Sequence, residues 1–235
     1  MSSDTTDKSA IRDAATVIAL RDRETAPRVL MGQRGSGAAF MPSKFVFPGG
    51  ALDTDDARVP LARPLPAVCA ARLQEDCDVD LSHALAAAAI RELWEETGLA
   101  LGLPGAWDAP PPDWKDFAAK GLRPSAHALQ FVFRAITPPG RPRRFDARFF
   151  LVDAGEIAGD LDDFSGAQDE LSHLHWVPLA EARALDLPFI TEVVLAEVAA
   201  RAHDPNPPET VPFFRNDDEE SLLLRLRGAG HERAL

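Results

Sequence analysis

The segment that most restricts the fold is residues 81–97, which contain neither glycine nor proline. The segment is rich in Ala, Leu and Glu, which are strong helix formers, so it predicts one long helix. Ser82 and Asp80 are the candidate caps at its start. Gly98 follows directly, and glycine is the usual residue where a helix ends, so we expect the helix to stop there.

The end of this predicted helix carries three glutamates, Glu92, Glu95 and Glu96. Their i, i+3 and i+4 spacing places the three carboxylates on one helical face, one turn apart. They repel one another and also lie at the negative end of the helix dipole. A hard cation such as Mg²⁺ or Mn²⁺ would offset both costs, because these ions prefer oxygen ligands. Taken alone, however, the same spacing is also typical of a solvated helix face.

Short apolar or aromatic runs bounded by turn residues predict the strands. They cover residues 14–20, 28–34, 128–136, 145–152, 170–177 and 222–226. Further helices are predicted at residues 67–75, 113–120, 179–184 and 191–202. Because strands and helices alternate along the chain, the predicted fold class is α/β (α+β), with helices packed on a mixed sheet.

The domain organisation expected from the sequence is simple. Residues 1–12 are polar and predict a disordered tail, and residues 13–235 predict a single domain. Residues 56–82 differ in character from their surroundings because they hold prolines at positions 60, 64 and 66. We interpret this stretch as an insertion.

Composition limits the partners of the chain. The formal net charge is −12, which argues against nucleic acid or an anionic membrane as a partner, because both require a surplus of Lys and Arg. The partners that remain possible on this ground are small molecules or a second copy of the chain. Cys69 and Cys77 form no disulfide framework, and no secretory signal or membrane span is evident. We therefore expect a soluble, cytoplasmic protein.

Residues 91–99 read Arg-Glu-Leu-Trp-Glu-Glu-Thr-Gly-Leu, and residues 47–50 read Phe-Pro-Gly-Gly. The first stretch resembles the second half of the Nudix box, G-x5-E-x7-R-E-U-x-E-E-x-G-U, at every specified position. The second is similar to the lead-in that commonly precedes that box. The resemblance to Nudix hydrolases implies an α/β/α sandwich with a mixed central sheet. It also implies hydrolysis of a diphosphate linkage in a nucleoside-diphosphate-X compound.

The chain departs from the family box in one respect. Arg91 lies 41 residues after Gly50, whereas the usual box places its arginine 14 residues after the glycine. Asp56 occupies the position of the box glutamate counted from Gly50, and His83 occupies it counted from Arg91. In the family this glutamate pairs with the box arginine. The partner of Arg91 therefore stays open, with Asp53, Asp56 and Glu75 as candidates.

Such an interrupted box is similar to that of the peroxisomal-type coenzyme A diphosphatases, as are residues 31–34 and 143–150. This likeness implies coenzyme A or acyl-CoA as the substrate. An ADP-ribose or NADH pyrophosphatase is the alternative within the enzyme class. A nucleotide-sensing Nudix module without catalysis is the alternative outside it, and the intact glutamates argue against that.

The family resemblance also implies roles for individual residues. It implies that Mg²⁺ or Mn²⁺ is held by Glu92, Glu95 and Glu96, with Glu170 as a further ligand. The implied catalytic residues are Glu95, Arg91 and Glu170. His127, His173 and His175 are alternative general bases. The substrate-binding residues expected from it are Gly49, Gly50, Arg34 and Arg144. A homodimer is common in the family and is expected here.

Overall fold

The computed structural model describes residues 10–38, 41–216 and 221–228. Its centre is a sheet with the strand order β11-β10-β7-β8-β1-β2-β3, in which β4 also pairs with β1 and β9 with β2. The strands of this sheet are β1 (Ile11–Arg21), β2 (Arg28–Arg34), β3 (Phe45–Val46), β4 (Gly49–Ala51), β7 (Gln130–Ile136), β8 (Arg144–Asp153), β9 (Leu171–Pro178), β10 (Val211–Asn216) and β11 (Ser221–Leu226). Strand β1 runs parallel to β8 and antiparallel to β2, so the central sheet is mixed, as the sequence predicts.

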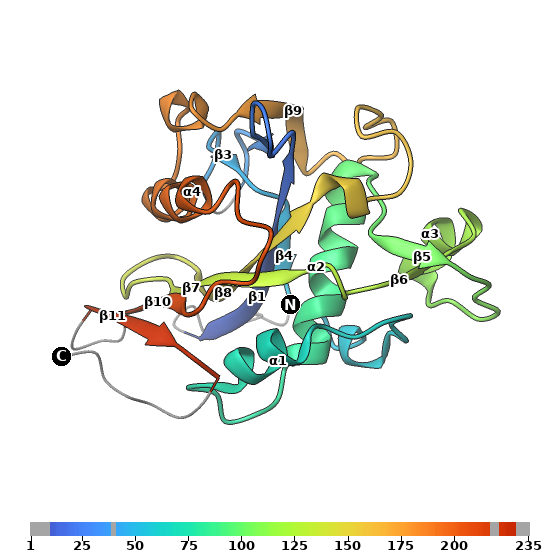
Figure 1. Ribbon diagram of the computed structural model, residues 1–235, viewed down its shortest axis with the longest axis horizontal. Helices are drawn as coiled ribbons and strands as arrows, with labels where there is room; N and C mark the ends of the chain where they lie inside the picture. Colours follow the sequence, from blue (N-terminus) through green and yellow to red (C-terminus); the bar gives the residue numbers. More distant parts are fainter. Residues whose placement is uncertain (1–9, 39–40, 217–220, 229–235) are drawn as a thin grey trace, which may run out of the picture.

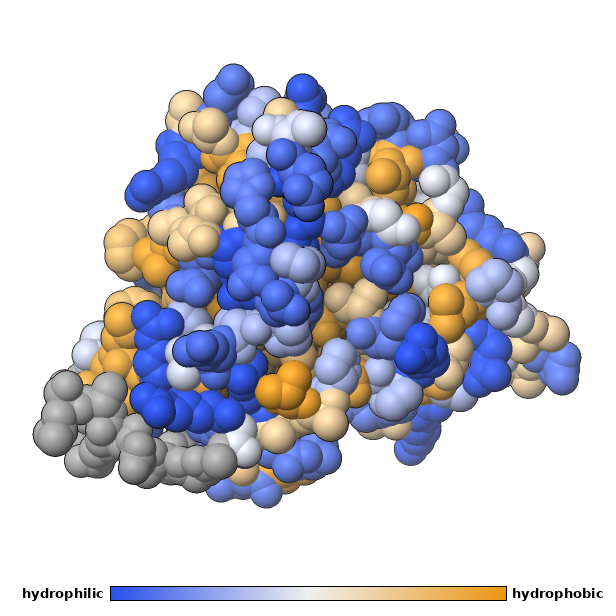
Figure 2. Space-filling model, viewed as in Figure 1, coloured by the Kyte–Doolittle hydropathy of each residue, from blue (hydrophilic) through white to orange (hydrophobic). Residues whose placement is uncertain are grey.

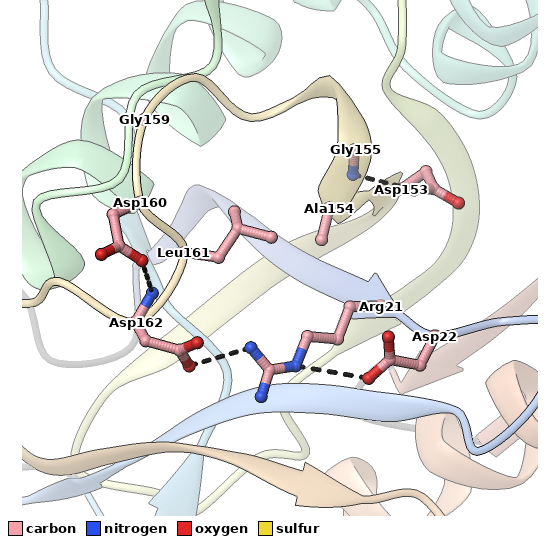
Figure 3. Close-up of a pocket in the computed structure, with 9 residues that line it drawn as sticks. All are labelled: Arg21, Asp22, Asp153, Ala154, Gly155, Gly159, Asp160, Leu161 and Asp162. Atoms are coloured by element: carbon pink, nitrogen blue, oxygen red, sulfur yellow. Dashed lines mark hydrogen bonds and ion pairs between the residues drawn. The ribbon is translucent and has the colours of Figure 1, made fainter.

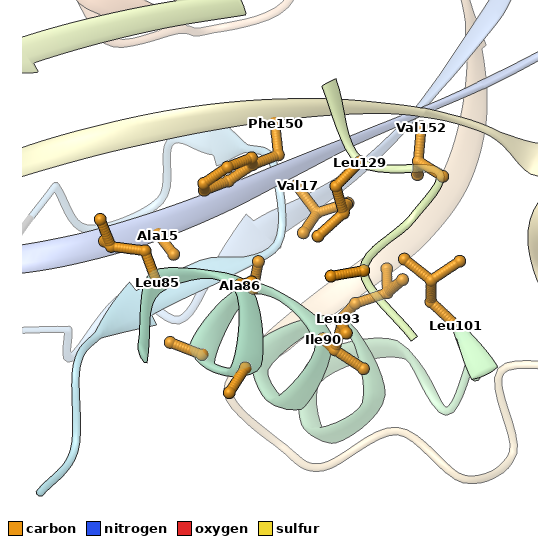
Figure 4. Close-up of a cluster of buried hydrophobic side chains, with 14 of the residues drawn as sticks. Ala15, Val17, Leu85, Ala86, Ile90, Leu93, Leu101, Leu129, Phe150 and Val152 are labelled. Carbon is orange, nitrogen blue, oxygen red and sulfur yellow. The ribbon is translucent and has the colours of Figure 1, made fainter. Parts of the chain in front are cut away.

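The helices cover both faces of this sheet. They are α1 (Ala67–Gln74), α2 (Ser82–Thr97), α3 (Lys115–Ala119) and α4 (Phe189–Ala200). Alternate residues of a strand point to opposite faces, and β1 follows this rule. Ala15 and Val17 pack in the cluster that contains α2, as Figure 4 shows. Ile18 and Leu20 pack in the second cluster, which contains α4 (Figure 1). The predicted α/β/α sandwich is therefore confirmed.

Helix α2 packs on the sheet through small side chains. Ala86, Ala87, Ala88 and Ala89 are fully buried, as are the larger Leu85 and Ile90. Alanine lets the helix axis approach the sheet closely, and it also has the highest helix propensity. The same residues therefore form the helix and fix it against β1, which gives its last turn a defined position.

Several elements differ from the sequence prediction. The helix expected at residues 179–184 is wrong, because only a single 3-10 turn forms there, η4 (Ala182–Ala184). Strand β10 was not predicted, nor was the separate small sheet of β5 (Gly102–Pro104) and β6 (Leu122–Pro124). Figure 1 shows this small sheet beside α3, at the edge of the molecule. The remaining 3-10 turns are η1 (Asp56–Arg58), η2 (Pro112–Trp114) and η3 (Ala154–Glu156).

The first strand begins earlier than expected. Ile11 and Arg12 already pair with Arg144 and Phe145 of β8, so they belong to β1 rather than to a tail. Residues 1–9 of the predicted tail lie outside the described residues.

The surface is mixed in character. Figure 2 shows hydrophilic residues interspersed with small hydrophobic patches over the face in view. Among the described residues, no helix combines the length and the apolar character needed to cross a bilayer.

Candidate active site

The candidate site is built on the last turn of α2. Gly98 ends the helix in the left-handed conformation, with φ 74°, and its N–H donates to Trp94 O at 2.8 Å. At the start of the helix, the carboxylate of Asp80 accepts hydrogen bonds from the Ser82 N–H and from the Ser82 hydroxyl. Asp80, rather than Ser82, therefore supplies the side-chain acceptor there. The helix boundaries thus agree with those expected from the sequence. They place Glu92 one helical turn before Glu95 and Glu96, as predicted.

Arg91 holds this turn to the loop after β4. Its Nε and Nη2 atoms donate to the two carboxylate oxygens of Asp56 at 3.0 Å each. Its Nη1 donates to Glu92 Oε1 at 2.8 Å and to Glu95 Oε2 at 3.1 Å. Asp53 is more distant, at 3.7 Å from Nη2. Asp56 is therefore the main partner of Arg91 among the three candidates.

Glu75, the third candidate, lies elsewhere. Its carboxylate accepts hydrogen bonds from the backbone N–H groups of Arg227 and Gly228, beyond the end of β11. Glu75 is therefore not a partner of Arg91.

Glu96 is the most deeply buried of the three helix carboxylates, with 2% of its surface exposed. Its Oε2 accepts a hydrogen bond from the Gly49 N–H at 2.7 Å. Its Oε1 is also buried but has no hydrogen-bond partner among the described residues. Burial, together with the nearby charge of Glu92, raises the pKa of Glu96 well above its ordinary range. A buried carboxylate oxygen without a partner is costly, and a bound cation would satisfy it.

Gly49 and Gly50 bring the backbone of β4 against these carboxylates. A Cβ atom on Gly50 would lie 2.5 Å from Glu92 Cδ, and one on Gly49 would lie 2.6 Å from Ala15 O. No side chain fits at either position without displacement of its neighbours. The two glycines therefore allow the Glu92 carboxylate and the Glu96–Gly49 bond to occupy their places.

Glu170 approaches the site from the loop before β9. The loop is fixed to the end of α2 because the Gln168 N–H donates to Glu95 O at 2.8 Å. Glu170 Oε1 accepts a hydrogen bond from Arg34 Nη2 at 3.0 Å. Burial is the main cause of the raised pKa of Glu92 and of Glu96, and the negative charge of Glu170 adds to it. The structure thus brings Arg34 and Glu170 to the helix carboxylates.

Glu92 and Glu170 open onto a cavity of about 800 Å³ on the α4 side of the sheet, whereas Glu95 and Glu96 do not line it. Glu92, Glu170, Arg34 and both glycines line one end of it. The volume lies within the range of about 300–1,000 Å³ that is usual for small-molecule sites. Asp53, which the sequence offered only as a candidate partner of Arg91, also lines this end. None of His127, His173 and His175 lines the cavity.

Arg144 takes a different place from the other expected binding residues. Its side chain is buried, and its Nε and Nη2 atoms donate to the backbone carbonyls of Thr137 and Asn216. These bonds join the ends of β7 and β10 to β8. The structure does not bring Arg144 together with the carboxylates, whereas the neighbouring Arg143 lines the cavity.

A second hollow lies at the end of β1, between Arg21 and the loop that contains Asp160 and Asp162 (Figure 3). Arg21 donates to Asp162 Oδ1 at 2.9 Å and stacks on the Trp176 ring at 4.6 Å. The arginine is thus already occupied by internal contacts. We assign no site to this hollow.

The residues at the first cavity fit a divalent metal by their chemistry. Carboxylate oxygens are the ligands that Mg²⁺ and Mn²⁺ prefer, and Glu96 Oε1 is a buried oxygen in need of a partner. Among the described residues, no three carboxylate, imidazole or thiolate groups converge into a ready-made cage. Mg²⁺ usually keeps several waters and shares oxygens with substrate phosphates, so a sparse protein ligand set is compatible with it.

The carboxylates should make the metal-free protein sensitive to pH. Burial raises the pKa of Glu92 from 4.5 to about 7, so the folded chain retains a proton that the unfolded chain releases. Between pH 5 and 7 the free energy of unfolding should therefore fall as pH rises, by up to about 1.4 kcal/mol per pH unit for each such group. Urea unfolding at pH 5, 6 and 7 with a chelator measures this slope. The Glu92→Gln/Glu96→Gln variant should show a shallower slope, and parallel curves for the two proteins would contradict the assignment.

The comparisons with known proteins agree with this fold. A family model described as the NUDIX domain matches residues 79–198, which is just over half of the chain. A Caenorhabditis elegans protein provisionally named nudix hydrolase 7 is 29% identical over 182 residues, which cover 72% of this chain and 52% of that protein. The chain thus spans about half the length of this curated relative. The crystal structure of a NUDIX hydrolase from Alicyclobacillus acidocaldarius superposes with a TM-score of 0.59 at 28% identity. That match covers 84% of this chain and 94% of the other.

The chain belongs to the Nudix family. The family expected from residues 47–50 and 91–99 is therefore confirmed, and so is the fold class expected from the resemblance.

Proposed function

We propose that the chain is a Nudix hydrolase that cuts a diphosphate linkage in a nucleoside-diphosphate-X substrate and depends on Mg²⁺ or Mn²⁺. One observation carries this proposal. The buried carboxylates of Glu92 and Glu96 meet the glycine backbone of β4, and Glu92 lines the end of a large cavity together with Glu170 and Arg34. The relatives reported above are named as hydrolases of the same family.

The roles of the residues follow from their contacts. Glu92, Glu95 and Glu96 would hold the metal, with Glu170 as a further ligand. Arg91 is a positioning residue, because it fixes two of these carboxylates and is itself held by Asp56. When bound, a divalent ion lowers the pKa of a water molecule and neutralises phosphate charge.

Proton transfer falls to a carboxylate of the chain in this proposal. Glu95 is the first candidate for the general base because it is the least buried of the three helix glutamates, and burial still raises its pKa. Glu170 is the second candidate, since it is exposed at the cavity. Arg34 would hold a phosphate oxygen of the substrate if its bond to Glu170 opens on binding.

Coenzyme A or acyl-CoA is the substrate that we propose first. The cavity supports it through its volume of about 800 Å³ and its apolar wall, which includes Phe145, Phe149 and Phe214. ADP-ribose or NADH is the second candidate and uses the same carboxylates. A module that binds a nucleotide without cleavage is the third.

The function is tested by incubating the protein with coenzyme A, acetyl-CoA, ADP-ribose and NADH, in Mg²⁺, in Mn²⁺ and in EDTA. We expect metal-dependent cleavage of the diphosphate of at least one compound, and its loss in the Glu95→Gln/Glu96→Gln variant. Cleavage of coenzyme A supports the first substrate, and cleavage of ADP-ribose or NADH alone replaces it by the second. Binding without cleavage of any compound would contradict the hydrolase proposal and favour the third candidate.

Gly50→Ala should strongly impair this activity. The added Cβ would overlap the Glu92 carboxylate, so Glu92 must move. A displacement of about 1 Å in a catalytic group can reduce the rate about 10²-fold. Gly37→Ala is the matched control, because a Cβ there meets nothing within 4 Å. Steady-state kinetics of both variants measure this effect. Equal rates for Gly50→Ala and Gly37→Ala would show that catalysis does not need the close approach of the Gly50 backbone to Glu92.

A further inference from the structure

The end of the cavity opposite the carboxylates has a different chemistry. Its lining there includes Arg12, Arg141 and Arg143, whereas the acidic lining residues Asp53, Glu92 and Glu170 belong to the first end. Within the described residues, none of these three arginines has a carboxylate within 4 Å. Lys44, another basic lining residue, is by contrast paired with Asp186. In a chain with a net charge of −12, a group of arginines on one cavity wall that have no carboxylate partner among the described residues marks a place for an anion.

The strand register brings the two nearest arginines together. Arg12 of β1 pairs with Phe145 of β8, and Arg143 lies two residues before Phe145. Arg143 lies directly before the start of β8 and lines the same cavity as Phe145 and Ala147. Residues two apart in a strand share a face, so Arg12 extends the row of Ala14 and Thr16 in β1. These strand residues all line the cavity, so Arg12 and Arg143 lie at the same end of it.

The distance between the two ends follows from the same register. Thr16 pairs with Gly49, next to the carboxylates, and Arg12 lies four residues earlier in β1. At about 3.3 Å per residue, the two positions are about 13 Å apart. The wall between them is apolar and includes Ala14, Ala147 and Ile136. A ligand that fills both ends would therefore place one anionic group at each end of the cavity, with a less polar part between them.

We propose that Arg12, Arg141 and Arg143 form a second anion site that binds a phosphomonoester of the substrate, apart from its diphosphate. This inference rests on the function proposed above, because the diphosphate is placed at the carboxylate end. Arginine suits a phosphomonoester because its planar guanidinium group donates two parallel hydrogen bonds to phosphate oxygens. A nucleotide with a phosphate on its ribose 2′ or 3′ oxygen is the substrate class that this arrangement selects.

Two matched pairs of compounds test the proposal, since each pair differs by one phosphomonoester. NADPH and NADH differ at the 2′ position, and coenzyme A and dephospho-coenzyme A differ at the 3′ position. Binding is measured by calorimetry in EDTA, so that it does not depend on turnover, and KM and kcat are measured in Mg²⁺. The variants are Arg12→Ala/Arg143→Ala and, as a control of equal charge change, Arg63→Ala/Arg183→Ala. Both control arginines are exposed and lie outside the cavity lining.

We expect the phosphorylated member of at least one pair to bind about tenfold more tightly, as for one charge-assisted contact. The Arg12→Ala/Arg143→Ala variant should lose this preference through KM, with little change in kcat, whereas the control variant should retain it. A preference in the NADPH pair identifies a 2′-phosphate, and one in the coenzyme A pair a 3′-phosphate. Equal binding within both pairs, or a preference that survives in the Arg12→Ala/Arg143→Ala variant, would overturn the proposal. A preference lost in that variant, without hydrolysis of any compound, would support the anion site and contradict only the proposed hydrolysis.

Discussion

Arg91→Met should reduce the free energy of unfolding by about 3–5 kcal/mol, because it leaves a buried carboxylate without its cation. Asp56 is only 2% exposed, and both of its carboxylate oxygens accept hydrogen bonds from Arg91. Methionine fills much of the volume of arginine but supplies neither charge nor donors. The lost stability should therefore come from the unpaired charge of Asp56 and from the repulsion between Glu92 and Glu95 that Arg91 no longer offsets. A cavity in the core should contribute little to it.

Urea unfolding followed by tryptophan fluorescence measures this effect. Arg58→Met is the matched control, because Arg58 is 79% exposed and pairs with an equally exposed Asp55, so its loss should cost less than about 1 kcal/mol. Adding Asp56→Asn to Arg91→Met should recover part of the stability, since it removes the stranded charge. A loss below about 1 kcal/mol for Arg91→Met would mean that the network does not hold α2 to the loop after β4.

Glu96→Gln should separate catalysis from stability. Glutamine retains an oxygen that can accept the Gly49 N–H bond, but it carries no charge to hold a metal. Under the proposed function we expect kcat to fall by about 10²-fold or more, a loss of the size seen when one preorganised electrostatic contact is removed. The free energy of unfolding of the metal-free protein should change by less than about 1 kcal/mol, because burial raises the pKa of Glu96 and already favours its neutral form.

Steady-state kinetics and urea unfolding of the same preparation test both parts of this expectation. Glu181→Gln is the control, because Glu181 is exposed and lies outside the cavity. A Glu96→Gln protein that turns over at the wild-type rate would remove Glu96 from the proposed metal ligands. A protein that is inactive but unfolded would leave the role of Glu96 to be measured in Glu96→Asp, which keeps the charge.

The sequence predicts the end of α2 well because its determinants are local. Helix propensity, the terminal glycine and the spacing of the glutamates all lie within residues 81–98. The partner of Arg91 could not be chosen from the sequence, because Asp53, Asp56 and Glu75 are all acidic and all lie in the region before the helix. Only the packing of the loop after β4 brings Asp56 against the guanidinium group.

Strand alternation explains why Arg144 does not reach the cavity. Residues 145, 147 and 149 are Phe, Ala and Phe and line the cavity, so alternation along β8 turns Arg144 away from it. Arg144 points to the other face, where it binds backbone carbonyls. Strand β10 was missed for a different reason. Its apolar residues follow a proline-rich stretch, and it forms a strand because it pairs with the distant β7 and with β11.

Under the proposed function, the carboxylates of α2 bind a divalent metal. Titration of the protein with Mn²⁺, followed by electron paramagnetic resonance of the free ion, tests it without reference to any substrate. The wild-type protein should bind Mn²⁺ saturably at pH 7.5, and Glu92→Gln/Glu96→Gln should bind it at least about tenfold more weakly, since two anionic ligands are lost. Equal binding by the two proteins would contradict the account and place the metal elsewhere.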